Sequence, residues 1–190
     1  MKAGNGLRVV IINGRPCSGK TTFEMMCESI LGSVYCERRS TVDKVKELAA
    51  EAGWKGEKTP AARKMLSDLK DVFTAYNDMP FEDIVQYLRG WESDLAFYNV
   101  GNHTHVLFVD DREPEHIDRL KQRLNAYTVL IRRPGDDDED LVLSNHADRD
   151  VFNYSYDFVI ENDGSIHDLY EKAQHFLNSI FSENRGIIEL

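Results

Sequence analysis

Short apolar runs along the chain alternate with longer stretches in which apolar residues recur every three or four positions. The four clearest runs are Leu7–Asn13 (LRVVIIN), His105–Val109 (HVLFV), Tyr127–Ile131 (YTVLI) and Tyr156–Ile160. β-Branched and aromatic residues dominate the first three, which predicts strands buried on both faces. A fifth, shorter strand is expected at Val34–Glu37.

The stretches between these runs have the apolar spacing of amphipathic helices. A helix is expected after the first run and ends at Gly32. Further helices are expected, in chain order, at Ser40–Ala52, Ala61–Tyr76, Phe81–Tyr98, Pro114–Leu124 and Ile166–Phe181. Strands that alternate with helices predict a parallel sheet covered by helices on both faces. We therefore expect an α/β fold in three layers, in which residues of about 40–100 form a helical insertion between strands 2 and 3.

Length, composition and charge narrow the class of protein. The 190 residues suit a single domain spanning 1–190, and 42% hydrophobic with 29% charged residues is typical of a globular protein. The formal net charge of −10 repels polyphosphate backbones, so we expect no nucleic-acid partner. No apolar run approaches the roughly 20 residues of a membrane span. We therefore expect no membrane partner. Cys17, Cys27 and Cys36 are an odd number of cysteines without metal-ligand spacing, which favours a reducing, cytoplasmic setting. His103 and His105 are expected at the surface.

A glycine-rich segment after the first predicted strand carries the strongest chemical signal. Its sequence, GRPCSGKTT, contains G-x-x-x-x-G-K-[ST] without a mismatch. Glycines let successive backbone N–H groups curl around an anion, and the following helix points its positive end at the same anion. We expect Lys20 at the β- and γ-phosphates of ATP and Thr21 as a ligand of Mg²⁺. The loop residues expected at the nucleotide are Gly14, Arg15, Pro16, Cys17, Ser18, Gly19, Lys20, Thr21 and Thr22.

Two carboxylates follow the second buried run, at Asp110 and Asp111. A P-loop site needs a carboxylate that holds Mg²⁺ through its water shell, usually at the end of a neighbouring apolar strand. We expect Asp110 in this role ahead of Asp111. The alternative is a turn, in which strand-terminal aspartates are common.

Basic residues follow the predicted strands and occur in the predicted insertion. Ligands of open α/β sheets bind at the carboxyl ends of the strands, and phosphoryl transfer needs positive charge around the migrating group. The expected acceptor-site residues are Arg38, Arg39, Lys58, Arg63 and Arg112. The expected catalytic cations are Lys20, Arg112 and Arg132. For each arginine and for Lys58, a solvated surface charge is the alternative.

Four segments occur in an order that is known from one family. They are the loop GRPCSGKTT, the segment GWKGEK (Gly53–Lys58) with Arg63, the segment VDDREPE (Val109–Glu115), and RRPG with the later NDGS (Asn162–Ser165). In this the chain resembles the P-loop nucleoside monophosphate kinases, most closely the phage-type deoxynucleoside monophosphate kinases. The resemblance implies ATP, Mg²⁺ and a core sheet of five parallel strands. It also implies a lid at about 134–153 and places Asn162, Asp163 and Gly164 near the adenine of ATP.

Three functions are compatible with this reading. The leading one is transfer of a phosphoryl group from ATP to a nucleoside or deoxynucleoside monophosphate. A kinase of another small acceptor is the second. A nucleotide-binding regulatory NTPase is the third. Such a protein needs a glutamine that positions the attacking water, and the sequence offers no good candidate for it. The lid region carries the acidic run Asp136–Asp140 and one arginine, Arg149. The base of the acceptor, the lid cation and the oligomeric state stay open.

Overall fold

Five parallel strands form one sheet at the centre of the protein, seen in a computed structural model that describes residues 6–97, 104–134 and 150–182. The strands lie in the order β2-β3-β1-β4-β5. Their bounds are β1 (Gly6–Asn13), β2 (Cys36–Ser40), β3 (Thr104–Asp110), β4 (Tyr127–Arg132) and β5 (Phe158–Glu161). The expected five-stranded parallel sheet is therefore confirmed.

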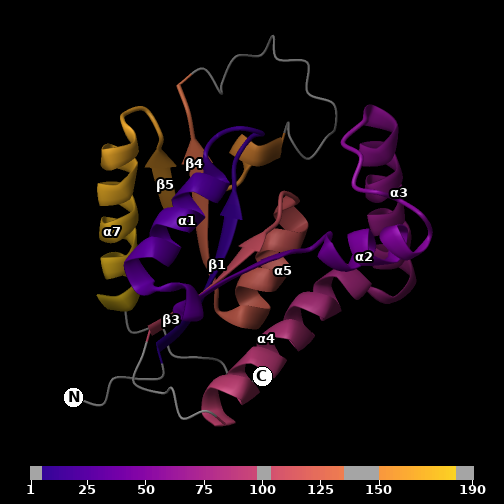
Figure 1. Ribbon diagram of the computed structural model, residues 1–190, viewed down its shortest axis with the longest axis horizontal. Coiled ribbons are helices and arrows are strands. Elements are labelled where there is room, and N and C mark those ends of the chain that lie inside the picture. The colour runs from indigo at the N-terminus through magenta and orange to yellow at the C-terminus, as the bar shows by residue number, and fades with distance from the viewer. Residues whose placement is uncertain (1–5, 98–103, 135–149, 183–190) are drawn as a thin grey trace.

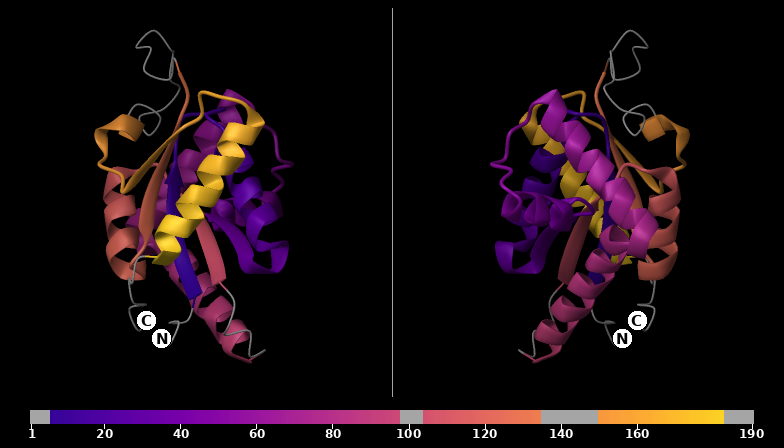
Figure 2. Two further views of the ribbon diagram at one scale, coloured as in Figure 1. Left: turned by 90° about the vertical axis from the view of Figure 1, so that its left-hand side faces the viewer. Right: turned by 90° about the vertical axis from the view of Figure 1, so that its right-hand side faces the viewer.

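Helices cover both faces of this sheet (Figures 1 and 2). They are α1 (Lys20–Leu31), α2 (Asp43–Glu51), α3 (Pro60–Asn77), α4 (Met79–Phe97), α5 (Pro114–Leu124) and α7 (Ile166–Ser182), with short 3₁₀ turns η1 (Ser33–Tyr35) and η2 (Asp150–Asn153). The helices α1 and α7 pack on one face, and α4 and α5 pack on the other. The helices α2, α3 and α4 lie between β2 and β3 in the chain, which confirms the helical insertion. In Figure 1, α2 and α3 stand to one side of the sheet.

Successive side chains of β1 point to opposite faces and build two separate cores. Val10 and Ile12 join the core under α1 and α7, whereas Val9 and Ile11 join the core under α4 and α5. Because both faces are covered, the strand reads as a continuous apolar run. In the parallel register Ile12 lies beside Asp110 of β3, so both strands end at the same edge of the sheet.

The second strand lies two to three residues later than the expected Val34–Glu37. Val34 lies in η1 and is 70% exposed, and β2 begins only at Cys36. Pairing with β3 along the whole of β2 outweighs the apolar pattern of the segment itself. As a consequence, Arg38 and Arg39 lie inside β2 and not after it. The last strand is likewise displaced by about two residues, to Phe158–Glu161.

His105 is buried, although the sequence predicted a surface position. Its ring makes T-shaped contacts with Tyr35, at a centroid distance of 5.1 Å, and with Trp91, at 5.8 Å. The imidazole therefore packs as part of an aromatic cluster at the start of β3. Among the described residues no helix is both long enough and apolar enough to cross a membrane.

Candidate active site

The loop between β1 and α1 depends on two glycines and is bound by its own lysine. Gly14 and Gly19 have φ angles of +150° and +106°, which glycine adopts without strain. A Cβ atom on Gly14 would lie 2.4 Å from the carbonyl oxygen of Ile131 in β4, so only glycine fits there. The Lys20 ammonium donates hydrogen bonds to the carbonyl oxygens of Gly14, at 2.6 Å, and Arg15, at 3.1 Å. The loop thus holds the lysine amine over its own curved backbone, where a phosphate would lie.

Asn162 supports this loop from the end of β5. Its side-chain amide donates a hydrogen bond to the carbonyl oxygen of Ser18 at 2.8 Å, and its backbone N–H donates one to the carbonyl oxygen of Arg132 at 2.7 Å. A Cβ atom on Gly19 would lie 2.4 Å from the same amide nitrogen. The contact between Asn162 and the loop is therefore close enough to require glycine at position 19.

Asp110 ends β3 next to the loop. Burial raises the pKa of the Asp110 carboxyl, and the positive charges of Lys20 and Arg112 oppose that rise. The fold therefore brings together the lysine of the loop and the strand-terminal carboxylate, from segments 90 residues apart. A carboxylate oxygen with the hydroxyl of Thr21 is the kind of oxygen donor set that suits Mg²⁺.

Asp111 points away from this site. Its Oδ1 accepts the backbone N–H groups of Arg112, at 2.7 Å, and Glu113, at 3.2 Å. Lys70 of α3 and His116 of α5 lie 3.7 Å from its two oxygens. We leave Asp111 out of the magnesium site proposed below, because its buried carboxylate lies between Lys70 and His116.

Glu24 is a buried carboxylate that sequence reasoning missed. It lies one helical turn after Lys20, is 2% exposed, and its Oε1 accepts no hydrogen bond from the described part of the chain. Burial, followed by the negative charge of Asp110, raises the pKa of Glu24 to about 8. The available signal was its position among the buried residues Phe23, Met26 and Cys27, where a charged residue is unusual.

The two arginines of β2 point to opposite faces of the sheet. Arg38 forms an ion pair of 2.5 Å with Glu28 on α1, on the same face as Lys20. Arg39 lies 3.6 Å from Asp83 of α4 and stacks 4.5 Å above the ring of Tyr87. Arg38 thus lies on the face of the sheet that α1 covers, whereas Arg39 is held by the insertion.

The remaining predicted cations are spread over several elements. Arg112 lies near Asp110. The guanidinium groups of Arg132, at the end of β4, and Arg15 both lie over the ring of Phe152, at 5.7 Å and 4.8 Å from its centroid respectively. Lys58 and Arg63 are exposed at the start of the insertion helix α3. The lid expected at about 134–153, with Asp136–Asp140 and Arg149, falls outside the described residues except at its two ends.

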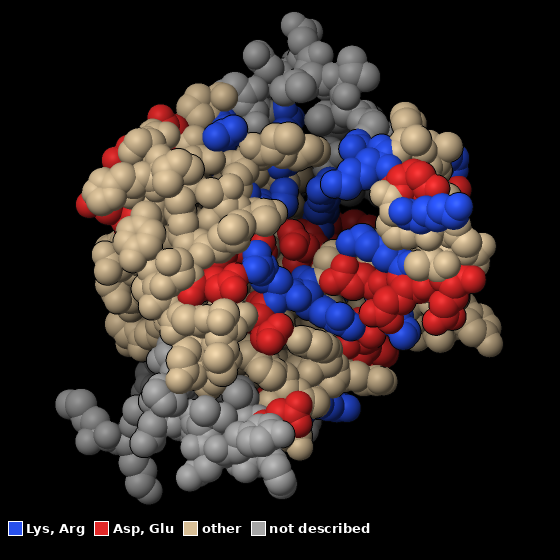
Figure 3. Space-filling view, viewed as in Figure 1, with Lys and Arg blue, Asp and Glu red and all other residues tan. Residues whose placement is uncertain are grey.

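Charged side chains surround a hollow between α1 and the insertion helices α2 and α3 (Figure 3). Both signs of charge occur along its rim. A hollow of mixed charge can bind an anion and a cation together, as a nucleotide with its magnesium ion requires.

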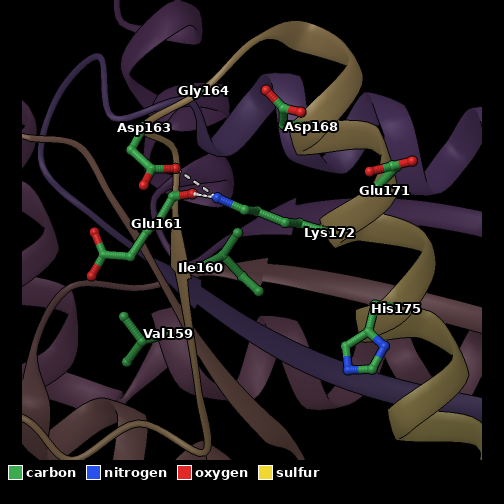
Figure 4. Close-up of a pocket in the computed structure, with 9 residues that line it drawn as sticks. All are labelled: Val159, Ile160, Glu161, Asp163, Gly164, Asp168, Glu171, Lys172 and His175. Atoms are coloured by element: carbon green, nitrogen blue, oxygen red, sulfur yellow. Dashed lines mark hydrogen bonds and ion pairs between the residues drawn. The ribbon is translucent and has the colours of Figure 1, made fainter.

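A second concave region lies along β5 and α7 (Figure 4). It has a volume of about 750 Å³, and Asp163 and Gly164 are among the residues that line it. Lys172 closes one side by donating to the carbonyl oxygen of Glu161, at 2.5 Å, and to Asp163, at 2.7 Å. Two of the three residues expected near adenine thus lie at a pocket beside the loop-supporting Asn162.

Comparisons with known proteins describe a fold and leave the activity open. No known family model and no curated protein sequence matches this chain. The solved structures similar to it include thymidylate kinase from Ehrlichia chaffeensis, with 13% identity, a TM-score of 0.49, and coverage of 90% of this chain and 99% of that one. Shikimate kinase from Aquifex aeolicus has 13% identity, a TM-score of 0.48, and coverage of 90% and 97%. Shikimate kinase from Acinetobacter baumannii has 16% identity, a TM-score of 0.45, and coverage of 95% and 97%. At these values the fold assignment rests on this chain's own five-stranded parallel sheet in the order β2-β3-β1-β4-β5.

Proposed function

We propose that this protein transfers the γ-phosphoryl group of ATP, with Mg²⁺, to a nucleoside or deoxynucleoside monophosphate. The observation that carries the proposal is the meeting of three groups at one edge of the sheet. These are the glycine loop after β1, the Lys20 amine above it, and the Asp110 carboxylate at the end of β3. An ordinary glycine turn needs neither the lysine nor the carboxylate.

The donor side follows from the chemistry of these groups. The loop amides and Lys20 bind the β- and γ-phosphates, and Lys20 neutralises charge that grows on the migrating group. Thr21 and Asp110 would hold the magnesium ion, the second through water. When bound, Mg²⁺ neutralises charge on the β- and γ-phosphates. Asn162 holds the loop through its hydrogen bond to Ser18, and we propose the pocket lined by Asp163 and Gly164 as the site of the ATP base.

The acceptor side lies across the hollow toward the insertion. We propose Arg112, whose charge acts on Asp110, and Arg38, which pairs with Glu28 on α1, as ligands of the acceptor phosphate, because guanidinium groups match phosphate oxygens in pairs. Lys58 and Arg63 lie in the segment GWKGEK and on α3, where the family resemblance expects the acceptor. Arg132, at the end of β4, is the proposed cation for the migrating group. We propose that residues 40–100 bind the acceptor as part of a single domain.

A panel of nucleoside and deoxynucleoside monophosphates, each assayed with ATP and Mg²⁺, tests the proposal. We expect ADP release that saturates with one or a few of these acceptors. Shikimate and simple sugars belong in the same panel, because transfer to one of them alone would assign a kinase of another acceptor. ADP release that is equal with and without every acceptor would contradict the proposal and favour a regulatory NTPase.

A further inference from the structure

The insertion helix α3 is held to the rest of the protein in an unusual way. Among its 18 residues, all described, the one buried residue is Lys70, at 7% exposure. Apolar residues of the same helix are exposed, including Val72 at 60% and Tyr76 at 83%. A lysine is rarely buried unless its charge is paired, so the partners of Lys70 indicate what fixes the helix.

Those partners belong to the turn between β3 and α5. The Lys70 ammonium donates to Oε1 of Glu113 at 2.7 Å and lies 3.7 Å from Oδ1 of Asp111. His116 lies 3.7 Å from the other oxygen of Asp111 and 3.5 Å from Glu113. We call these four residues the Lys70 cluster. It joins the middle of α3 to a turn 41 residues further along the chain.

The turn that the cluster fixes carries Arg112. This arginine stands between Asp111 and Glu113, the two carboxylates that Lys70 bridges. Asp111 in turn accepts hydrogen bonds from the backbone N–H groups of Arg112 and Glu113, so its carboxylate shapes the turn directly. Asp110, the last residue of β3, immediately precedes this segment.

Removing the ammonium would leave the buried carboxylate of Asp111 beside the partly exposed carboxylate of Glu113. A buried carboxylate next to a second negative charge cannot stay ionised without cost, and within the cluster His116 is then the remaining group near both of them. The carboxylate of Asp111 would then gain a proton or move toward water. Either change weakens its hold on the two backbone N–H groups.

We propose that Lys70 is a positioning residue that fixes Arg112 at the acceptor site by binding Asp111 and Glu113 from α3. The functional part of this inference rests on the kinase function proposed above. The structural part, that one ammonium holds both the helix and the turn, does not. Lys70 contacts neither the loop nor Asp110 in this arrangement and acts through Arg112.

Hydrogen–deuterium exchange of the unliganded protein tests the structural part. In Lys70→Met, which keeps most of the apolar stem, the amides of Arg112 and Glu113 should exchange about tenfold faster or more. Amides of α1 should not change. The matched control is Lys64→Met on the same helix, because Lys64 is exposed and pairs only with the nearby Asp68 in the described contacts. Unchanged exchange at the turn in Lys70→Met, or an equal increase in Lys64→Met, would overturn the inference.

A second variant keeps the test decisive if Lys70→Met does not fold. Lys70→Gln keeps a polar end group on α3 but removes the positive charge that faces Asp111 and Glu113. It should speed exchange of the Arg112 and Glu113 amides by a smaller factor than Lys70→Met is expected to. No increase at all in Lys70→Gln would count against the Lys70 cluster as the element that fixes the turn.

Kinetics test the functional part with the nucleoside monophosphate that supports the fastest transfer in the panel. Lys70→Met should lower kcat/KM for that acceptor by about 10- to 100-fold, as small displacements of positioned groups do. The Kd of ADP should stay unchanged, and Lys70→Arg should restore much of the loss. A loss of thermal stability with unaltered kinetics would assign Lys70 a purely structural role. A parent protein without acceptor-dependent transfer would instead refute the proposed function, while the exchange experiment would still decide whether Lys70 holds the turn.

Discussion

Replacement of Glu24 by glutamine should stabilise the protein, and the gain should grow with pH. Burial, with the nearby charge of Asp110, raises the pKa of Glu24 from 4.5 to about 8. Below pH 4.5 the folded and unfolded chains both hold the proton, so the shift has no effect on the free energy of unfolding. Between pH 4.5 and 8 the unfolded chain releases the proton first, and the folded state loses stability as the pH rises. Above pH 8 the loss is complete and constant.

The size of the effect follows from the shift. One pH unit corresponds to about 1.4 kcal/mol, so the loss between pH 5 and pH 8 is at most about 3.5 kcal/mol. Relaxation and water entry reduce such values, and we expect about 1 to 3 kcal/mol. Glutamine does not titrate, so Glu24→Gln should lack this loss. Because any packing change caused by the amide is the same at both pH values, the difference between pH 5 and pH 8 is the quantity to measure.

Urea unfolding at pH 5 and pH 8, followed by circular dichroism with EDTA present, measures this difference. Parent and Glu24→Gln should diverge by about 0.5 M or more in midpoint between the two pH values. The matched control is Glu28→Gln, one turn later on α1, whose carboxylate is partly exposed and pairs with Arg38. This control should show no pH-dependent gain. Parallel pH profiles for the parent and Glu24→Gln would refute the burial of an ionisable group at this position.

Further substitutions test the site. Asp110→Asn should raise the Mg²⁺ concentration for half-maximal transfer by about tenfold or more, measured by magnesium titration at saturating ATP. Gly19→Ala should weaken ADP binding by about tenfold in a fluorescent-nucleotide titration, because the new Cβ atom would lie 2.4 Å from the side-chain amide nitrogen of Asn162. Adding Asn162→Ala to the same chain should recover part of this loss in affinity. Arg38→Ala should raise the acceptor KM without changing the Kd of ADP. Arg39→Ala should leave that KM unchanged. In thermal unfolding it should lower the melting temperature by a few degrees, because the lost ion pair with Asp83 contributes about 1 kcal/mol to the free energy of unfolding.

The sheet and the loop could be predicted because their signals are local. Leu7–Asn13 is apolar throughout since both faces of β1 are covered, and the glycine pattern follows at once in the chain. Asp110 could be inferred because parallel strands end at one edge of a sheet. In each case the residues that carry the information are neighbours in sequence or in the strand register.

The features that sequence reasoning missed depend on contacts between distant segments. Arg38 and Arg39 are adjacent in sequence, and which face each one takes is set by the start of β2, which pairing with β3 decides. The partners of Asp111 come from α3 and α5, so the residues next to Asp111 in the sequence do not predict its contact with Lys70. His105 is buried because Tyr35 and Trp91 converge on it from other elements.

Phosphorus NMR of one reaction mixture tests the central claim most directly. The mixture contains parent protein, ATP, Mg²⁺ and the best monophosphate acceptor of the panel, and Lys20→Ala serves as the matched control. The account predicts that the γ-phosphate resonance of ATP disappears as the β-phosphate resonance of a new nucleoside diphosphate grows in equal amount. It also predicts a rate at least about tenfold lower in Lys20→Ala, a rise of about 1.4 kcal/mol or more in the barrier. Inorganic phosphate as the only product, or equal rates in the two proteins, would contradict it.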